Sequence, residues 1–160
     1  MKFFEDIETG VEEPVGSYTF TAQEIKAFAA KFDPQPFHMD EEAARRSHFG
    51  RLCASGWHTA AVWMKLMIAY RASQIEETMN GERGHLGPSP GFEDLKWIRP
   101  VYAGDTISYT SMIEDKRLLA TRPGWGMVSH VNWGINQNGE KVFSFRSRVL
   151  VGTRATATSR

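Results

Sequence analysis

One apolar stretch, residues 56–70, restricts more than any other feature how this chain can fold. Its apolar residues recur at helical spacing on all sides: Trp57, Ala60, Ala61, Met64 and Ile68. This pattern predicts a long helix that is buried on most of its sides. We expect the helix to begin near Ser55–Gly56 and to run to about Ala72, with residues 73–79 extending it after a break.

A helix of this kind needs a surface to cover it, and the chain after residue 91 predicts one. Apolar and polar residues alternate there in segments around residues 107–113, 125–135 and 143–151. The dipeptide Asn138–Gly139 predicts a hairpin between the last two segments. With a short strand expected at residues 14–20, the pattern indicates an α+β fold in which an antiparallel sheet of four or five strands wraps one long helix.

Length and charge limit the classes of function that are open to the chain. Its 160 residues are best read as one domain at residues 1–152, followed by a flexible tail at residues 153–160. Nineteen basic and nineteen acidic side chains cancel, so no overall positive field is available to attract nucleic acid or an anionic membrane. The apolar stretch is also too short to span a bilayer. Because Cys53 is the only cysteine and residues 1–6 have no apolar signal core, we expect a cytoplasmic protein.

The segment that follows the first predicted strand has clear helix signals. Thr21 and Glu24 form a capping-box pattern, and the helix that they begin should end at Asp33, which precedes a proline. Residues 34–38 contain two prolines, so we expect them to form a stiff loop. Asp40 then has the position of an N-cap for a short helix at residues 41–46.

Asp33 and His38, at the two ends of this stiff loop, are the leading candidates for chemistry. Full extension would separate their backbones by roughly 16 Å, so the loop must bend if they are to share a proton path. A carboxylate beside an imidazole provides general acid–base catalysis near neutral pH, which is worth about 10²–10⁴ in rate. From spacing alone, the alternative is favoured: Asp33 only turns the chain and His38 bonds to the backbone.

The same stretch, Asp33-Pro34-Gln35-Pro36-Phe37-His38, resembles the Asp-x-Asn-Pro-x-His motif of the MaoC-like dehydratase and (R)-specific enoyl-CoA hydratase family. Three further stretches resemble that family in the same order along the chain: residues 4–10, 54–56 and 95–106. This resemblance implies a hot-dog fold, in which a sheet wraps a central helix. It also implies a homodimer or a dimer of dimers, and reversible addition of water across the 2,3 double bond of an enoyl-CoA thioester. The only cofactor implied is coenzyme A, as part of the substrate, with no metal.

The resemblance also assigns roles to individual residues. Asp33 and His38 would activate the water, and the backbone N–H of Gly56 would stabilise the thioester oxyanion. An alternative reading of Gly56 is that it only permits close contact between helix and sheet. Gln35, Ser55 and Trp57 are candidates for substrate binding, and Gln35 departs from the family pattern, which has asparagine there.

Other patterns in the sequence indicate chemistry less clearly. Cys53 with a histidine is a possible thiol nucleophile, but no acid is positioned to orient that histidine, and the histidines lack zinc-ligand spacing. We expect His58 to be structural. The glycine-rich stretch at residues 81–91 is a candidate binding loop. Arg45, Arg46 and Arg51, or Arg146 and Arg148 on the last strand, are candidates for the phosphates of coenzyme A, but a role as solvated surface is favoured. A thioesterase, or a non-catalytic acyl-CoA-binding subunit of the same fold, is the alternative function.

Overall fold

The computed structural model describes residues 2–76 and 84–157. Its elements, in chain order, are η1 (Phe4–Asp6, a 3₁₀ helix), β1 (Glu12–Thr19), α1 (Ala22–Phe32), α2 (Pro36–Met39), α3 (Glu41–Arg46), α4 (Gly56–Glu76), β2 (Gly91–Trp97), β3 (Thr106–Leu118), β4 (Trp125–Ile135), β5 (Lys141–Gly152) and α5 (Arg154–Ala157).

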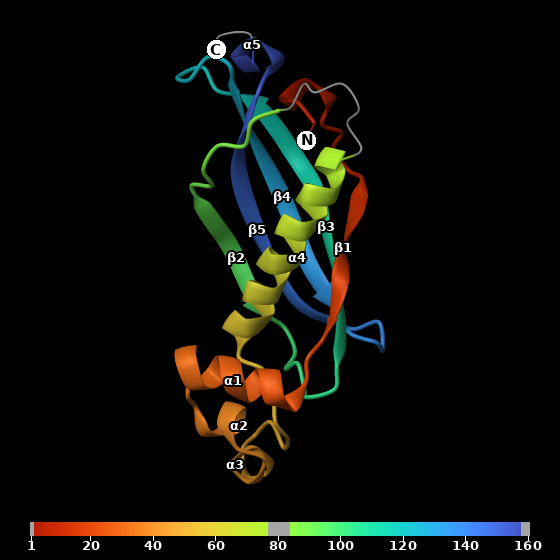
Figure 1. The fold of residues 1–160 in the computed structure, drawn as a ribbon, viewed down its shortest axis with the longest axis vertical. Helices are drawn as coiled ribbons and strands as arrows, with labels where there is room; N and C mark the ends of the chain where they lie inside the picture. The colour runs from red at the N-terminus through yellow and green to blue at the C-terminus, as the bar shows by residue number, and fades with distance from the viewer. Residues whose placement is uncertain (1, 77–83, 158–160) are drawn as a thin grey trace.

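The strands form one antiparallel sheet in the order β1-β3-β4-β5-β2, and α4 lies along one face of it (Figure 1). The predicted α+β arrangement is therefore confirmed. The expected hairpin joins β4 to β5, and Gly139 has the positive φ of 78° that such a turn requires. Since β1 and β2 are the outer strands, the described sheet has two edges.

Buried side chains from α4 and from the concave face of the sheet make up the core. Val62, Trp63 and Met67 of α4 pack in one cluster with Tyr109 of β3 and Phe145 of β5. The hydroxyl of Tyr109, which is 1% exposed, donates to the carbonyl of Thr59 at 3.1 Å. That bond joins the start of α4 to the sheet.

The course of α4 differs from the prediction in two respects. The helix continues to Glu76 without the expected break, and residues 77–79 lie outside the described residues. The expectation of burial on most sides was wrong: Trp57, Met64 and Ile68 are 51%, 51% and 56% exposed. A single five-stranded sheet covers one side of the helix, and this apolar stripe faces away from it.

Helices α1, α2 and α3 gather at the end of the molecule where α4 begins (Figure 1). The predicted capping box is confirmed, because Glu24 N–H donates to the Thr21 hydroxyl and the Glu24 carboxylate accepts from Thr21 N–H. Asp40 caps α3 as expected. The stiff loop was wrong in part: Pro36 begins a single helical turn, α2, because its fixed φ suits the first position of a helix.

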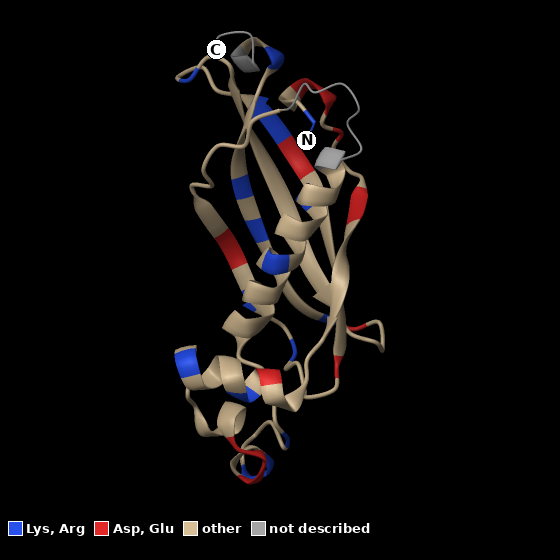
Figure 2. Cartoon of the chain, viewed as in Figure 1, with Lys and Arg blue, Asp and Glu red and all other residues tan. Residues whose placement is uncertain are grey.

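The two ends of the described chain meet at the opposite end of the molecule (Figure 1). The expected tail begins with the short helix α5, whose Arg154 pairs with Asp6 at 2.6 Å. Basic and acidic residues are found at both ends of the ribbon, with no large region of one sign in this view (Figure 2). A search of the described helices finds none with the length and hydropathy needed to cross a membrane.

Candidate active site

A cavity of about 510 Å³ lies where α1 and α2 meet the start of α4. Its walls include Asp33, His38 and Gly56, the three residues that the sequence predicted for catalysis. Trp97, at the end of β2, and Arg99, just beyond it, line the same cavity. The fold therefore brings the motif at residues 33–38 to the first turn of the long helix.

Asp33 is held by two hydrogen bonds, one to each carboxylate oxygen. The Ser55 hydroxyl donates to Oδ2 at 2.7 Å, and the Gln35 side-chain amide donates to Oδ1 at 2.8 Å. Burial raises the pKa of Asp33, but these two donors and the nearby His38 outweigh it, and the pKa is lowered from its usual range. Asp33 is therefore an ionised acceptor at neutral pH, with its oxygens fixed in direction.

His38 lies on α2 and is buried, with 5% of its surface exposed. Its Nδ1 lies 2.7 Å from the backbone carbonyl oxygen of Cys53. Because a carbonyl oxygen only accepts, Nδ1 carries the proton, and in the neutral ring Nε2 keeps its lone pair. Nε2 lies 3.5 Å from Asp33 Oδ2. The site thus presents two proton acceptors side by side.

The first turn of α4 brings a backbone N–H to the wall of the cavity at Gly56. Within the described part of the chain, Trp57 N–H donates to the Ser55 hydroxyl, and the N–H groups of His58 and Thr59 donate to the Ser55 carbonyl. No described residue accepts from the N–H of Gly56. A helix of this length also concentrates partial positive charge at its first amides. This N–H is therefore suited to an anionic oxygen.

Gly56 also permits a close contact, as the alternative reading held. A Cβ at this position would come within 2.5 Å of three atoms of the Trp97 indole, namely Cε2, Nε1 and Cδ2. Trp97 in turn meets Trp57 edge to face, with ring centroids 5.2 Å apart. The two interpretations of Gly56 are compatible, since close packing depends on its missing side chain and the oxyanion role depends on its backbone N–H.

Of the three residues expected to bind substrate, Gln35 and Ser55 contact Asp33, and Trp57 is half exposed. Gln35 and Ser55 line the cavity, but both point their polar groups at Asp33. Ser55 is only 1% exposed, and its hydroxyl proton is donated to Asp33. Trp57 lines the cavity, is 51% exposed, and remains a candidate for contact with a ligand.

The surroundings of the weaker candidates, namely Cys53, His58 and the arginines, favour structural roles for them. Burial raises the pKa of the Cys53 thiol to about 11, which opposes a nucleophilic role. His58 is stacked on Phe28 at 4.5 Å and does not line the cavity, as expected for a structural residue. Arg146 and Arg148 form ion pairs with acidic side chains on the sheet. Among the residues that the structure describes, no group of three or more metal-ligating side chains gathers.

Reasoning from the sequence missed two contributors to this site. The Cys53 carbonyl sets the proton on His38, and Trp97 covers Gly56. A backbone carbonyl carries no residue signal, so nothing in the sequence could have indicated the first. The second had only a weak signal, a large aromatic side chain at the end of an alternating strand.

A single antiparallel sheet wrapped around one long helix is a hot-dog fold, and this one carries an aspartate–histidine pair at the start of the helix. The chain belongs to the MaoC-like domain family, whose model matches residues 6–133. It is thus a member of a family that includes hydratases and dehydratases.

Individual relatives are similar to this chain over most of its length. An uncharacterised Bacillus subtilis protein, YdeM, is 31% identical over 135 residues, which cover 84% of this chain and 88% of that protein. The crystal structure of a MaoC-like dehydratase from Rhodospirillum rubrum is 36% identical with a TM-score of 0.82, covering 96% of this chain and 99% of that one. The (R)-hydratase PhaJ1 from Pseudomonas aeruginosa shares the fold with a TM-score of 0.62 at 20% identity, covering 95% and 86% of the two chains.

Proposed function

We propose that this protein reversibly adds water across the 2,3 double bond of an enoyl-CoA thioester, acting as an enoyl-CoA hydratase or 3-hydroxyacyl-thioester dehydratase. The observation that carries the proposal is the geometry of the pair: Asp33 Oδ2 and His38 Nε2 lie 3.5 Å apart in a cavity that Gly56 also lines. The (R)-hydratase named among the structural relatives supports the reaction class by fold alone.

The two acceptors are suited to hold one water molecule. With Nδ1 donating to Cys53, Nε2 accepts one water hydrogen while the Asp33 carboxylate accepts the other. A water bound in this way directs its own lone pair away from both residues and toward the cavity. The bond that forms joins that oxygen to C3 of the substrate.

The proton released by the water has a preferred acceptor. Because the pKa of Asp33 is lowered, Asp33 stays ionised while Nε2 of His38 takes the proton. The imidazolium that results lies beside the Asp33 carboxylate, which stabilises it. His38 then gives this proton to C2, so the net change is addition of one water, and His38 returns to its neutral form. In the dehydration direction the same steps run in reverse.

Between the two proton transfers, electrons from the double bond collect on the thioester oxygen as an enolate. The N–H of Gly56, free among the described residues and at the start of a 21-residue helix, donates to that oxygen. Donors of this kind are typically worth about 10²–10³ in rate. No metal or redox cofactor is needed for these steps, and coenzyme A enters with the substrate.

We further propose that the protein works as a homodimer. The exposed apolar stripe of α4 includes Met64 and Ile68, and the outer strand β2 exposes Phe92 and Trp97 by 58% and 48%. A second copy would cover these surfaces and remove the sheet edge. The single cysteine is consistent with work in a reducing compartment such as the cytoplasm. Light scattering coupled to size-exclusion chromatography tests the dimer, and a monomer at micromolar concentration would refute it.

The reaction is tested with crotonyl-CoA and longer trans-2-enoyl-CoAs, following loss of conjugated-thioester absorbance beside release of free thiol. We expect absorbance loss without thiol release. Asp33→Asn and His38→Ala should each lose at least about 10² in rate while staying folded. Asp40→Asn is the matched control, because Asp40 caps α3 outside the cavity and asparagine caps almost as well.

Each alternative gives a different outcome in the same assay. Thiol release from the wild-type protein would indicate a thioesterase. If no substrate of the panel gave either absorbance loss or thiol release, that result would favour a non-catalytic binding protein. Near-normal hydration by both Asp33→Asn and His38→Ala would refute the assignment of the site.

A further inference from the structure

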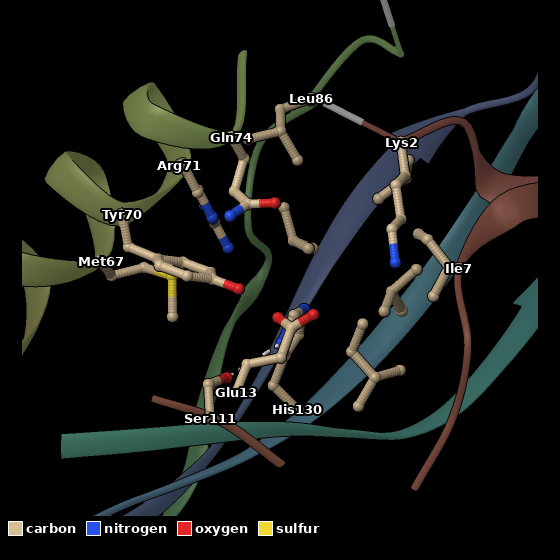
Figure 3. A pocket seen from close by; sticks show the side chains of 14 residues that line it. Lys2, Ile7, Glu13, Met67, Tyr70, Arg71, Gln74, Leu86, Ser111 and His130 are labelled. Carbon is tan, nitrogen blue, oxygen red and sulfur yellow. Dashed lines mark hydrogen bonds between the residues drawn. The ribbon is translucent and has the colours of Figure 1, made fainter. Parts of the chain in front are cut away.

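A second cavity, of about 340 Å³, lies at the opposite end of α4 from Asp33 and His38. It is lined by Tyr70, Arg71 and Gln74 of α4, by the N-terminal segment, and by the concave face of the sheet (Figure 3). Arg71 is 15 residues beyond Gly56, which corresponds to about 22 Å along a helix. Leu86 also lines it, so the described part of the glycine-rich loop borders this cavity and not the first one. Residues 81–83 of that loop lie outside the described residues.

The two cavities are separate. They share no lining residue, and between them the space from helix to sheet is filled by Trp63, Tyr109 and Phe145. These three are 5%, 1% and 8% exposed, and Trp63 meets Phe145 edge to face at 4.6 Å. A ligand in the second cavity therefore does not reach the Asp33–His38 pair.

The charged side chains that line the second cavity have no ion-pair partner among the described residues. Arg71 is half-buried, and no described residue forms an ion pair or hydrogen bond with its guanidinium. Lys2 and Glu13 also line the cavity without an ion-pair partner in the described chain. Figure 3 shows the Arg71, Lys2 and Glu13 side chains directed toward the same space. Two cations and one carboxylate leave one positive charge, which a monoanion would neutralise.

His130, on β4, adds a polar position on the floor of the cavity. Its Nδ1 lies 3.4 Å from the Ser111 hydroxyl, which donates its own proton to Asn132 at 2.8 Å. Nδ1 therefore carries the proton, and Nε2, which is buried and has no partner among the described residues, is left with a lone pair. Burial, and then Arg71, lower the pKa of His130 to about 4, so the ring is neutral at pH 7. The lone pair on Nε2 is an open position for water or for a ligand hydroxyl.

The remaining walls are aliphatic. Val128, Val149 and Val151 of β4 and β5 line the cavity together with Ile113 of β3 and Met67 of α4. A cavity with an apolar floor and cations that reach into it from its walls fits a ligand that is apolar along its length and anionic at one end. An inorganic anion would leave the apolar surface uncovered, and a neutral hydrocarbon would leave Arg71 unpaired.

We propose that this cavity is a second binding site, which takes an aliphatic monocarboxylate with its carboxylate at Arg71 and Lys2 and its chain against the valines of β4 and β5. The site is independent of the proposed hydratase activity, since the core separates it from the first cavity.

The test uses sodium octanoate as the probe, titrated into the full chain and followed by calorimetry and by NMR of the histidine rings and valine methyls. We expect saturable binding at about 1 mM or tighter. The shifts should occur at His130 and Val149 and not at His38. 1-Octanol and octylamine, which match the chain but not the charge, should bind at least about tenfold more weakly.

Variants locate the carboxylate. Arg71→Gln should weaken octanoate binding by at least about tenfold, because it removes a charge-assisted hydrogen bond. Lys2→Gln changes an exposed residue, so it is a second variant that leaves the core untouched, and it should weaken binding by a smaller factor. The control is Arg117→Gln, which makes the same change at an exposed site on β3. Asp33→Asn should bind octanoate as the wild type does.

Three results would overturn the proposal. They are equal binding of octanol and octanoate, unchanged binding in Arg71→Gln and Lys2→Gln, and octanoate shifts at His38 with none at His130. Absence of any binding at several millimolar octanoate would do the same.

Discussion

Ser55→Ala tests most directly how the proposed site works, because it removes one donor from Asp33 without touching either proton acceptor. The Ser55 hydroxyl donates to Asp33 Oδ2 at 2.7 Å and is itself buried. A hydrogen bond to a charged group contributes about 1.5–3 kcal/mol. At about 1.36 kcal/mol per factor of ten, complete loss of that contribution in the transition state lowers kcat/KM by about 10-fold to 150-fold.

The pH profile separates this account from simple damage to the fold. Ser55 lowers the pKa of Asp33, so its removal raises that pKa. Because the proposed active form has Asp33 ionised, the acidic limb of kcat/KM against pH should move to higher pH in Ser55→Ala. Hydration of crotonyl-CoA measured across the acidic range gives this limb. Ser73→Ala is the control, since Ser73 is an exposed residue of the same helix that donates only to a backbone carbonyl.

Stability should change with pH in the same variant. A carboxyl whose folded pKa is lowered stabilises the fold above its unfolded pKa of about 3.9, and that stabilisation is lost as the pH falls through the folded pKa. Urea unfolding should therefore show a larger destabilisation by Ser55→Ala at pH 7 than at pH values below about 4. An unshifted acidic limb together with a wild-type rate would refute the positioning role of Ser55.

Two further predictions concern neighbours of the pair. Gly56→Ala should cost about 1–3 kcal/mol, because its Cβ would overlap the Trp97 indole, and Trp97→Ala in the same chain should recover most of that stability in urea unfolding. Equal costs of Gly56→Ala with and without Trp97 would contradict this packing. Cys53, which is buried and has its pKa raised to about 11, should react with iodoacetamide far more slowly in the native protein than in urea, as measured by mass spectrometry. Equal rates in the two states would show that the thiol is accessible.

Local signals in the sequence were sufficient to predict α1 and α3, two of the three short helices beside the site. Thr21 and Glu24 define the start of α1, and the proline after Asp33 defines its end. Both depend on interactions between residues at most a few positions apart, which a sequence displays directly. Gln35 keeps the extended backbone expected of a residue before proline, with φ −75° and ψ 141°.

The contacts that give the site its chemistry are not local. Ser55 and Asp33 are 22 positions apart, and His38 and Cys53 are 15 apart. Neither pair leaves a periodic or compositional trace, because each depends on where α1 and α2 pack against the start of α4. The expected stiff loop was wrong in part for a related reason. A proline is compatible with both an extended segment and the first turn of a helix, and the hydrogen bond of His38 to the Cys53 carbonyl is a nonlocal contact that the helical turn makes.

The substitution at Gln35 now has a physical interpretation. The side-chain amide of Gln35, which stands where the family pattern has asparagine, donates to Asp33 Oδ1 at 2.8 Å. Because Ser55 donates to Oδ2, the carboxylate is held through both of its oxygens. Because both donors favour the ionised form, they make Asp33 a poor proton donor for the proposed addition step. In the proposed pair, this leaves Nε2 of His38 for that task. The other ring nitrogen, Nδ1, donates its proton to the Cys53 carbonyl oxygen, which can only accept. The longer side chain at position 35 is therefore compatible with the proposed division of work, in which Asp33 orients the water and His38 moves the proton.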